Sequence, residues 1–193
     1  MNINMRLGEI GVKIVYYGPP YSGKTTNIER LHATANPGHR SELTSMKNKE
    51  DRTLFFDFMQ LELGQIGGLT PRINLYTVPG QVIYEATRQI VLRGADAIVF
   101  VADSSAKQLR ENLWSWRQLK TQLVAMNCDP EKFPVVVQLN KRDLPDALSV
   151  QDLRKGLGLN GHRCIEAQAR RDIGTRETLR AAVKAVLGAD RRG

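Results

Sequence analysis

One octapeptide near the N-terminus carries the residue types that bind a chain of phosphates. Residues 18–25 are Gly-Pro-Pro-Tyr-Ser-Gly-Lys-Thr and fit the pattern G-x-x-x-x-G-K-[ST]. In a loop of this kind, backbone N–H groups converge on phosphate oxygens at the N-terminus of a helix. Lys24 would place a positive charge at the β- and γ-phosphates, and the Thr25 hydroxyl would ligate Mg²⁺. We therefore predict a nucleoside triphosphate site formed by Gly18, Tyr21, Ser22, Gly23, Lys24, Thr25 and Thr26.

A second motif, Asn140-Lys141-Arg142-Asp143, indicates which base the nucleotide carries. Guanine presents two donors, N1–H and N2–H₂, on the edge that the Asp143 carboxylate would meet, and a carboxylate only accepts hydrogen bonds. Adenine offers no such pair of donors. The motif therefore favours guanine and disfavours a P-loop kinase or an ATPase, with Asn140, Lys141 and Asp143 as candidate binding residues.

Strands and helices must hold these motifs, and the apolar pattern indicates where they lie. A β-branched run at residues 12–17 predicts a strand that ends at the first motif, and residues 25–33 have helical spacing. Residues 39–51 predict a long loop, and a hairpin follows with strands at 53–63 and 72–78. Strands and helices then alternate, with strands at 97–102, 134–139 and 164–167 and helices at 83–92, 108–126, 150–157 and 178–187.

This alternation predicts an α/β fold with three layers: a mostly parallel sheet, one antiparallel edge pair, and helices on both faces. Ligands of such folds bind at the carboxyl ends of the strands. Both motifs directly follow predicted strands, so the fold brings them to the same edge of the sheet.

Length and charge restrict the class of protein. The 193 residues suit a single domain over residues 1–193, and 41% hydrophobic with 25% charged residues is ordinary for a globular protein.

The net charge of +8 would fit nucleic acid, a membrane surface or a phosphorylated ligand. The motifs assign Lys24 and Lys141 to the nucleotide. The remaining surplus lies from Gln151 onward, with a short basic tail at 188–193, so we expect no nucleic acid and leave an acidic protein or lipid surface open.

Two further features bear on location. Cys128 and Cys164 are the two cysteines, too few for a disulfide framework, which predicts a cytoplasmic protein. No apolar stretch approaches the ~18 residues that span a bilayer, so we expect any membrane contact to be peripheral.

Together the motifs resemble those of Ras-like small GTPases, and over nearly its full length the chain resembles the bacterial MglA-type polarity and gliding-motility GTPases. The resemblance also rests on Asp-Arg-Thr-Leu-Phe-Phe-Asp-Phe at 51–58, Thr-Val-Pro-Gly-Gln at 77–81 and Val-Phe-Val-Ala-Asp-Ser at 99–104. It implies a molecular switch that hydrolyses GTP to GDP and phosphate.

The resemblance also implies roles for individual residues. Thr53 would join Thr25 at Mg²⁺ and contact the γ-phosphate, and Gly80 with Gln81 would form switch II. Gln81 would orient the attacking water, and Arg52 would act as an intrinsic arginine finger. A backbone N–H at Ala167 or Gln168 would contact the guanine.

Partners follow from the same resemblance. Nucleotide would order two segments, residues 39–57 (switch I) and 79–88 (switch II), which contact effector proteins. The expected regulator is a roadblock-domain protein of the MglB type, and the expected place of action is the cytoplasm of a bacterium, with recruitment to the cell poles or the inner membrane surface.

Two residues depart from the Ras pattern. Thr77 stands where most small GTPases have an Asp near the magnesium shell, a form that MglA-type proteins share. Pro20 stands where MglA-type proteins usually have glycine, and proline has no N–H to donate. We therefore expect slow hydrolysis without a regulator, and the alternative is a pseudo-GTPase scaffold that binds guanine nucleotide with very slow or no hydrolysis.

Overall fold

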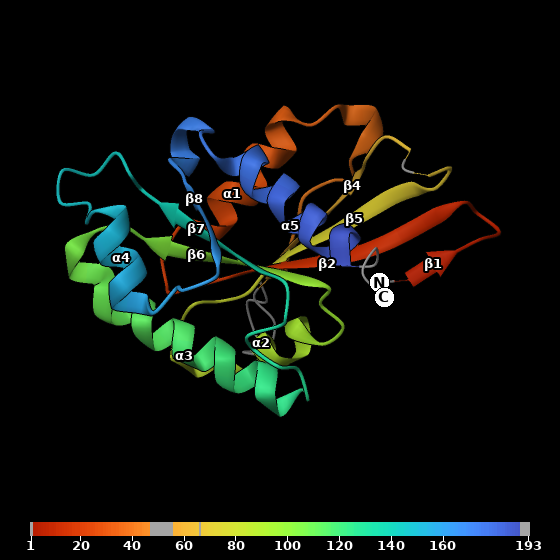
Figure 1. Cartoon of the computed structure of the whole chain (residues 1–193). Helices are drawn as coiled ribbons and strands as arrows, with labels where there is room; N and C mark the ends of the chain where they lie inside the picture. The colour runs from red at the N-terminus through yellow and green to blue at the C-terminus, as the bar shows by residue number, and fades with distance from the viewer. Residues whose placement is uncertain (1, 47–55, 66, 190–193) are drawn as a thin grey trace.

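A single mixed β-sheet forms the centre of the molecule (Figure 1). The computed structural model describes residues 2–46, 56–65 and 67–189. In this part of the chain the strand order is β3-β4-β5-β2-β6-β7-β8, and β1 pairs with β2. The strands are β1 (Asn2–Asn4), β2 (Glu9–Tyr17), β3 (Thr44–Met46), β4 (Phe56–Glu62), β5 (Thr70–Thr77), β6 (Ala97–Asp103), β7 (Val135–Asn140) and β8 (Arg163–Glu166).

Helices cover both faces of this sheet (Figure 1). On one face α1 (Lys24–Thr34) and α5 (Thr175–Ala189) pack against apolar residues of the sheet, and on the other face α2 (Glu85–Leu92), α3 (Leu109–Ala125) and α4 (Val150–Leu157) do so. Every residue of β6 and β7 is buried, as expected for parallel strands that are covered on both sides. The predicted three-layer α/β fold is confirmed. Among the described helices, none has the length and apolar character that crossing a membrane requires.

The antiparallel part of the sheet is larger than the sequence predicts. The expected hairpin is present as β4 and β5, although residues 53–55 lie outside the described part. The segment predicted as a long loop, residues 39–51, begins at the end of a 3-10 turn (Pro37–His39) and contains strand β3, which pairs antiparallel with β4. A further antiparallel pair joins β1 to the start of β2. The described part of the sheet therefore has three antiparallel pairs instead of one. The sequence did not show the additional pairs because strands of three residues are too short to show a period.

The C-terminal helix is also longer than the pattern indicates. Helix α5 begins at Thr175 and continues to Ala189, whereas the periodic apolar residues cover only 178–187. Residues 188 and 189 of the expected basic tail therefore belong to this helix, and residues 190–193 lie outside the described part.

A buried polar network fixes α1 relative to the sheet. The side-chain amides of Asn27 on α1 and Gln138 on β7 exchange two hydrogen bonds of 2.7 and 2.8 Å. Gln138 also donates to the hydroxyl of Thr178 on α5, and Asn27 donates to the carbonyl of Gly23. Because buried polar groups are costly without partners, this network holds the helix that follows the phosphate motif in one position.

Candidate functional site

The predicted phosphate-binding loop lies between β2 and α1, and its backbone requires glycine at two positions. Gly18, Tyr21 and Gly23 have φ values of 145°, 60° and 104°, in the region that favours glycine. A Cβ atom on Gly18 would collide with the Val101 carbonyl of β6, and one on Gly23 would collide with the side chain of Asn140. The second collision shows that the phosphate loop and the guanine motif are packed directly together.

Lys24 is buried within this loop. Its side chain is 7% exposed, and its Nζ donates to the carbonyl oxygens of Gly18 (2.9 Å) and Pro19 (2.7 Å). Burial lowers the pKa of Lys24 to about 7, with a smaller contribution from the Arg88 charge, and the Asp57 carboxylate opposes both. The lysine ammonium is therefore held inside the predicted phosphate loop by two of the loop's own carbonyl oxygens.

Asp57, to which the sequence assigned no role, lies beside the phosphate loop. This carboxylate on β4 is 8% exposed and accepts a hydrogen bond from the Thr25 hydroxyl at 2.7 Å. It also accepts from the hydroxyls of Thr77 on β5 (2.9 Å) and Ser45 on β3 (2.7 Å). The carboxylate that Thr77 lacks is therefore supplied by the neighbouring strand. The sequence contained one signal for the importance of Asp57, which is its position in the strand. In the alternating segment Phe56-Asp57-Phe58, the aspartate is the residue that faces the buried side.

The side chains around Thr25 fit a magnesium ion. Mg²⁺ prefers hard oxygen ligands, usually one or two carboxylates with waters and substrate phosphates. The Thr25 hydroxyl and the Asp57 carboxylate are such ligands, and the hydroxyls of Ser45 and Thr77 hold the carboxylate from its other sides. Thr53, the other predicted ligand, lies outside the described residues, as does Arg52.

The guanine motif lies at the end of β7. Asn140 is 2% exposed, donates to the Ser22 carbonyl at 2.8 Å and accepts from the backbone N–H of Ala169 at 2.9 Å. Lys141 forms an ion pair of 2.6 Å with Asp103. Asp143 is exposed at a cavity of about 460 Å³ that the phosphate loop also lines. Asn140 thus joins the phosphate loop to the turn that follows β8.

In that turn the structure corrects the expected base contact. The N–H of Ala167 donates to the Leu139 carbonyl and the N–H of Gln168 donates to the Ile173 carbonyl, so both are engaged within the protein. The cavity beside Asp143 is lined by Ala169 and Arg170 instead. A match of short motifs could not place this turn, because its register depends on the pairing of β8 with β7.

The start of switch II lies against the phosphate loop. A Cβ atom on Gly80 would collide with the backbone of Pro19 and Pro20. Gln81 follows with an exposed side chain, just before the 3-10 turn at Val82–Tyr84. A cavity of about 400 Å³ brings these groups together; its lining includes Pro20, Lys24, Thr25, Asp57, Thr77, Gly80 and Gln81.

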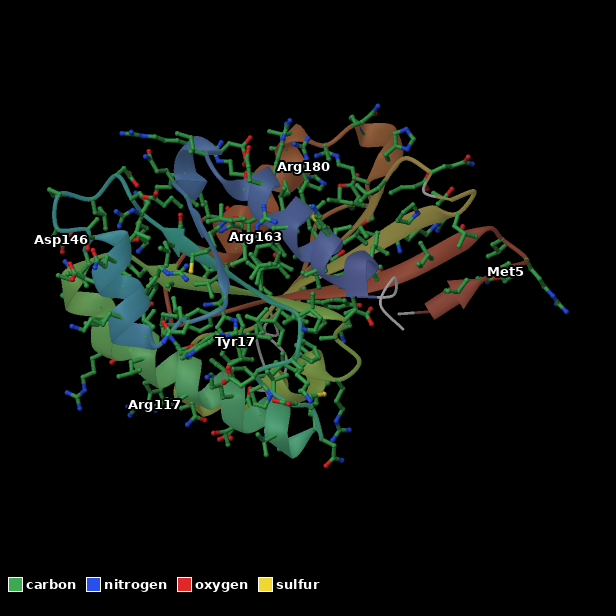
Figure 2. The ribbon with its side chains drawn as sticks, in the orientation of Figure 1. Met5, Tyr17, Arg117, Asp146, Arg163 and Arg180 are labelled. Carbon is green, nitrogen blue, oxygen red and sulfur yellow. The ribbon has the colours of Figure 1, made fainter. Side chains whose placement is uncertain are left out.

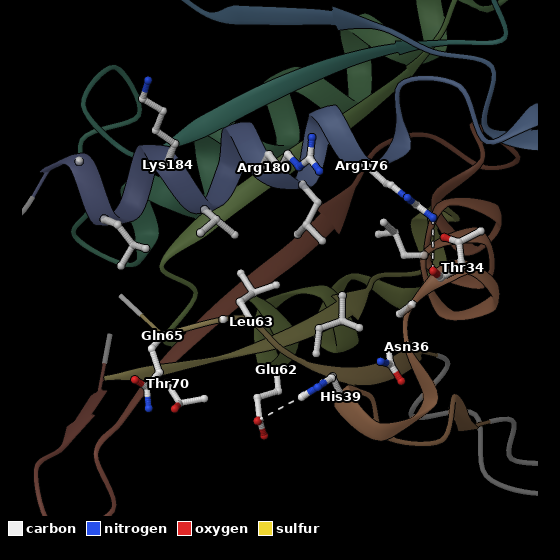
Figure 3. A pocket seen from close by; sticks show the side chains of 18 residues that line it. Thr34, Asn36, His39, Glu62, Leu63, Gln65, Thr70, Arg176, Arg180 and Lys184 are labelled. Atoms are coloured by element: carbon white, nitrogen blue, oxygen red, sulfur yellow. Dashed lines mark hydrogen bonds and ion pairs between the residues drawn. The ribbon is translucent and has the colours of Figure 1, made fainter. Parts of the chain in front are cut away.

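A larger cavity lies away from all these residues. It measures about 900 Å³ and lies between α5 and the β4–β5 hairpin, with an ion pair between Glu62 and His39 at its rim (Figure 3). Five leucines and Val183 contribute to its lining, and none of the predicted site residues that the structure describes does so. The chemistry of the motifs, rather than cavity size, therefore identifies the nucleotide site.

Comparison with known proteins identifies the family of the chain. The sequence model of the ADP-ribosylation factor family matches residues 2–178. The chain is also 44% identical to the mutual gliding-motility protein MglA of Myxococcus xanthus, over 96% of this chain and 95% of that protein. The chain belongs to the MglA-type small GTPases. More distant similarity, at 28% identity, extends to ADP-ribosylation factor-like protein 6 of Caenorhabditis briggsae (81% of this chain, 74% of that protein) and to the Ypt/Rab-type GTPase YPT7 of Saccharomyces cerevisiae (76% and 68%).

Membership in this family establishes the general reaction, which is the hydrolysis of GTP. Small GTPases bind GTP and GDP and hydrolyse GTP, generally with Mg²⁺. The MglA-type GTPase described here has the phosphate loop, the guanine motif and the start of switch II at one edge of its sheet.

The position of Asp143 predicts a change of base preference on substitution. Asp143→Asn replaces one acceptor of the guanine donors by a group that also donates, so we expect GTP affinity to fall by about tenfold or more. Xanthosine triphosphate has a carbonyl acceptor in place of the guanine N2–H₂, so it should bind Asp143→Asn more tightly than it binds wild type. Titration with fluorescent nucleotides measures both affinities, and Glu29→Gln, which removes an exposed carboxylate on α1, is the matched control. Unchanged GTP affinity in Asp143→Asn would show that the guanine assignment is wrong.

Proposed function

We propose that this protein is a GTP-operated switch for bacterial cell polarity or gliding motility, built as one G domain over residues 1–193 and acting in the cytoplasm. The observation that carries the proposal is the convergence of the phosphate loop, Asp57 and Gln81 on one cavity beside the guanine motif. The cellular role is supported by the 44% identity to a protein named for gliding motility.

The nucleotide would be held by groups with separate tasks. Backbone N–H groups of residues 21–26 would bind the phosphates at the N-terminus of α1, where Lys24 would add its charge. Thr25, Asp57 and Thr53 would hold Mg²⁺, which when bound neutralises charge on the phosphate oxygens. Asp143 selects guanine, and Asn140 keeps the base-binding turn against the phosphate loop.

Hydrolysis requires a water in line with the bond between the γ-phosphorus and the bridging oxygen. Gln81 would orient that water, and Arg52 would stabilise the charge that develops as the bond breaks, leaving GDP and phosphate. Pro20 cannot donate an N–H at this point in the loop, so we propose that hydrolysis is slow until a regulator binds. The pseudo-GTPase alternative loses one of its two arguments, because Asp57 supplies the carboxylate that Thr77 lacks.

Exposed apolar side chains beside the site support a protein partner. Tyr21 in the phosphate loop is 85% exposed, and Ile83 and Ile90 in or after switch II are also largely exposed. Apolar residues that gather beside a functional site commonly mark an interface. We propose that effectors bind here in the GTP state and that a roadblock-domain protein of the MglB type regulates hydrolysis.

The function is tested on the purified protein itself. We expect chromatography of the denatured protein to release GDP or GTP, and we expect bound GTP to be hydrolysed slowly in a single turnover and faster with a roadblock partner. Retention of an adenine nucleotide would contradict the proposal, and GTP that stays intact with the partner present would favour the scaffold alternative.

Asp57 predicts a change in the response to magnesium. Asp57→Asn keeps the shape of the side chain and removes its charge, so the gain in GTP affinity on adding Mg²⁺ should fall by about tenfold. The measurement is GTP affinity with Mg²⁺ and with a chelator, and Glu29→Gln again serves as the control. An equal magnesium effect in wild type and Asp57→Asn would remove Asp57 from the metal site.

Pro20 predicts a gain of hydrolysis. Pro20→Gly restores an N–H donor and removes the ring beside the γ-phosphate position, so single-turnover hydrolysis should rise by about tenfold or more while GTP affinity changes little. Pro130→Gly, in the turn after α3, controls for the general effect of losing a proline. Equal hydrolysis rates in wild type and Pro20→Gly would show that this proline does not limit the reaction.

A further inference from the structure

Arg88 on α2 is a buried cation whose hydrogen bonds reach into the start of switch II. The residue is 2% exposed, and its Nη1 donates to the carbonyl oxygen of Gln81 at 2.5 Å and, more weakly, to that of Pro79 at 3.4 Å. These two carbonyls belong to the residues on either side of Gly80. The guanidinium therefore holds the turn formed by residues 79–81.

The same turn is confined on its other side by the phosphate loop. Gly80 lies so close to the backbone of Pro19 and Pro20 that a Cβ atom would not fit. The turn is thus held between a rigid loop and a fixed guanidinium, and Gln81 projects from its end. Since the backbone carbonyl of Gln81 accepts a hydrogen bond from Arg88, the position of Gln81 depends on the position of Arg88.

Arg88 also interacts with a buried tyrosine of the protein core. Tyr17, the last residue of β2, is buried in the interior (Figure 2), and its hydroxyl donates to the side-chain oxygen of Gln122 on α3 at 3.1 Å. Burial raises the pKa of Tyr17 to about 12, and the Arg88 charge together with a hydrogen bond from Arg88 works against this rise. The Arg88 charge therefore interacts with the phenol of Tyr17, and the hydrogen bond to Gln122 fixes that phenol to α3.

We propose that Arg88 is a positioning residue for GTP hydrolysis, which fixes residues 79–81 between the Tyr17–Gln122 pair and the phosphate loop and thereby sets the place of Gln81. The inference rests on the proposed function, in which Gln81 orients the attacking water. Misplacement of a reacting group by about 1 Å can cost roughly 100-fold in rate, so a group that fixes the backbone of Gln81 affects catalysis without contact with the nucleotide. A guanidinium buried on the switch helix is costly unless donors are used, and here Nη1 donates to two carbonyls of the switch itself.

Three variants test the chain of contacts in steps. Arg88→Met keeps much of the side-chain length and removes every donor, so single-turnover hydrolysis should fall by at least about tenfold. Arg88→Lys retains one charged donor and should recover part of the rate. Tyr17→Phe keeps the ring and removes only the phenol oxygen, so a smaller loss of about threefold is expected. Arg110→Met, which removes an exposed arginine on α3, is the matched control.

Two further readouts separate positioning from a purely structural role. GDP affinity and the midpoint of thermal unfolding should stay close to wild type in Tyr17→Phe and Arg88→Lys. In a Gln81→Leu background, Arg88→Met should cause no further loss of hydrolysis, because both substitutions disable the same water-orienting group. An additional loss in that background would show that Arg88 acts on the phosphate directly and would overturn the positioning role.

The remaining outcomes are equally decisive. Suppose that wild type is active, Gln81→Leu is impaired, and Arg88→Met folds and hydrolyses GTP at the wild-type rate. This result overturns the inference and leaves the proposed function intact. A loss of hydrolysis matched by an equal loss of GDP affinity also overturns it. If Arg88→Met does not fold, full activity of both Tyr17→Phe and Arg88→Lys overturns the inference. Absence of hydrolysis in wild type with a roadblock partner, or full activity of Gln81→Leu, overturns the proposed function and this inference together.

Discussion

A carboxylate that is nearly removed from water is stable only if its oxygens accept hydrogen bonds, and Asp57 accepts them from three hydroxyls. The donors come from three different elements: Thr25 from α1, Ser45 from β3 and Thr77 from β5. Asp57 therefore ties the phosphate-binding helix to the antiparallel part of the sheet. The candidate magnesium ligands Thr25 and Asp57, the phosphate loop and strand β3 are therefore arranged around this one charge.

The rest of the site depends on the parallel part of the sheet. Strands β2, β6 and β7 are buried under helices on both faces, so their carboxyl ends stay in register and bring the motifs that follow them to one edge. Asn27 and Gln138 lock α1 to β7 below that edge. These contacts fix the phosphate loop and the guanine motif relative to the sheet. In the proposed function, the switch segments are the parts that change with the nucleotide.

Features encoded by neighbouring residues were predictable from the sequence. The phosphate loop, the guanine motif, helix α4 and the fully buried strands β6 and β7 each depend on a short run of residue types. Asp57 was missed because its importance arises from a partner on the next strand, 20 positions away in the case of Thr77. The turn after β8 was predicted to contact the base through Ala167 or Gln168, whereas Ala169 and Arg170 line the cavity beside Asp143. Because β8 has only four residues and a weak pattern, the sequence did not determine the register of this turn. Arg88 was missed because a lone arginine in a helix gives no sign of burial.

In the proposed function Asn140 and Asp143 have different tasks in base recognition, and this difference matters for engineering. Asn140 is committed to the protein, with its amide bonded to the Ser22 carbonyl and to the N–H of Ala169. Asp143, three residues later, is exposed and bears no such structural duty in the described part of the chain. A version of this protein that accepts an unnatural nucleotide, and so can be controlled separately from the other GTPases of a living cell, is therefore best sought by changing Asp143 while Asn140 stays untouched.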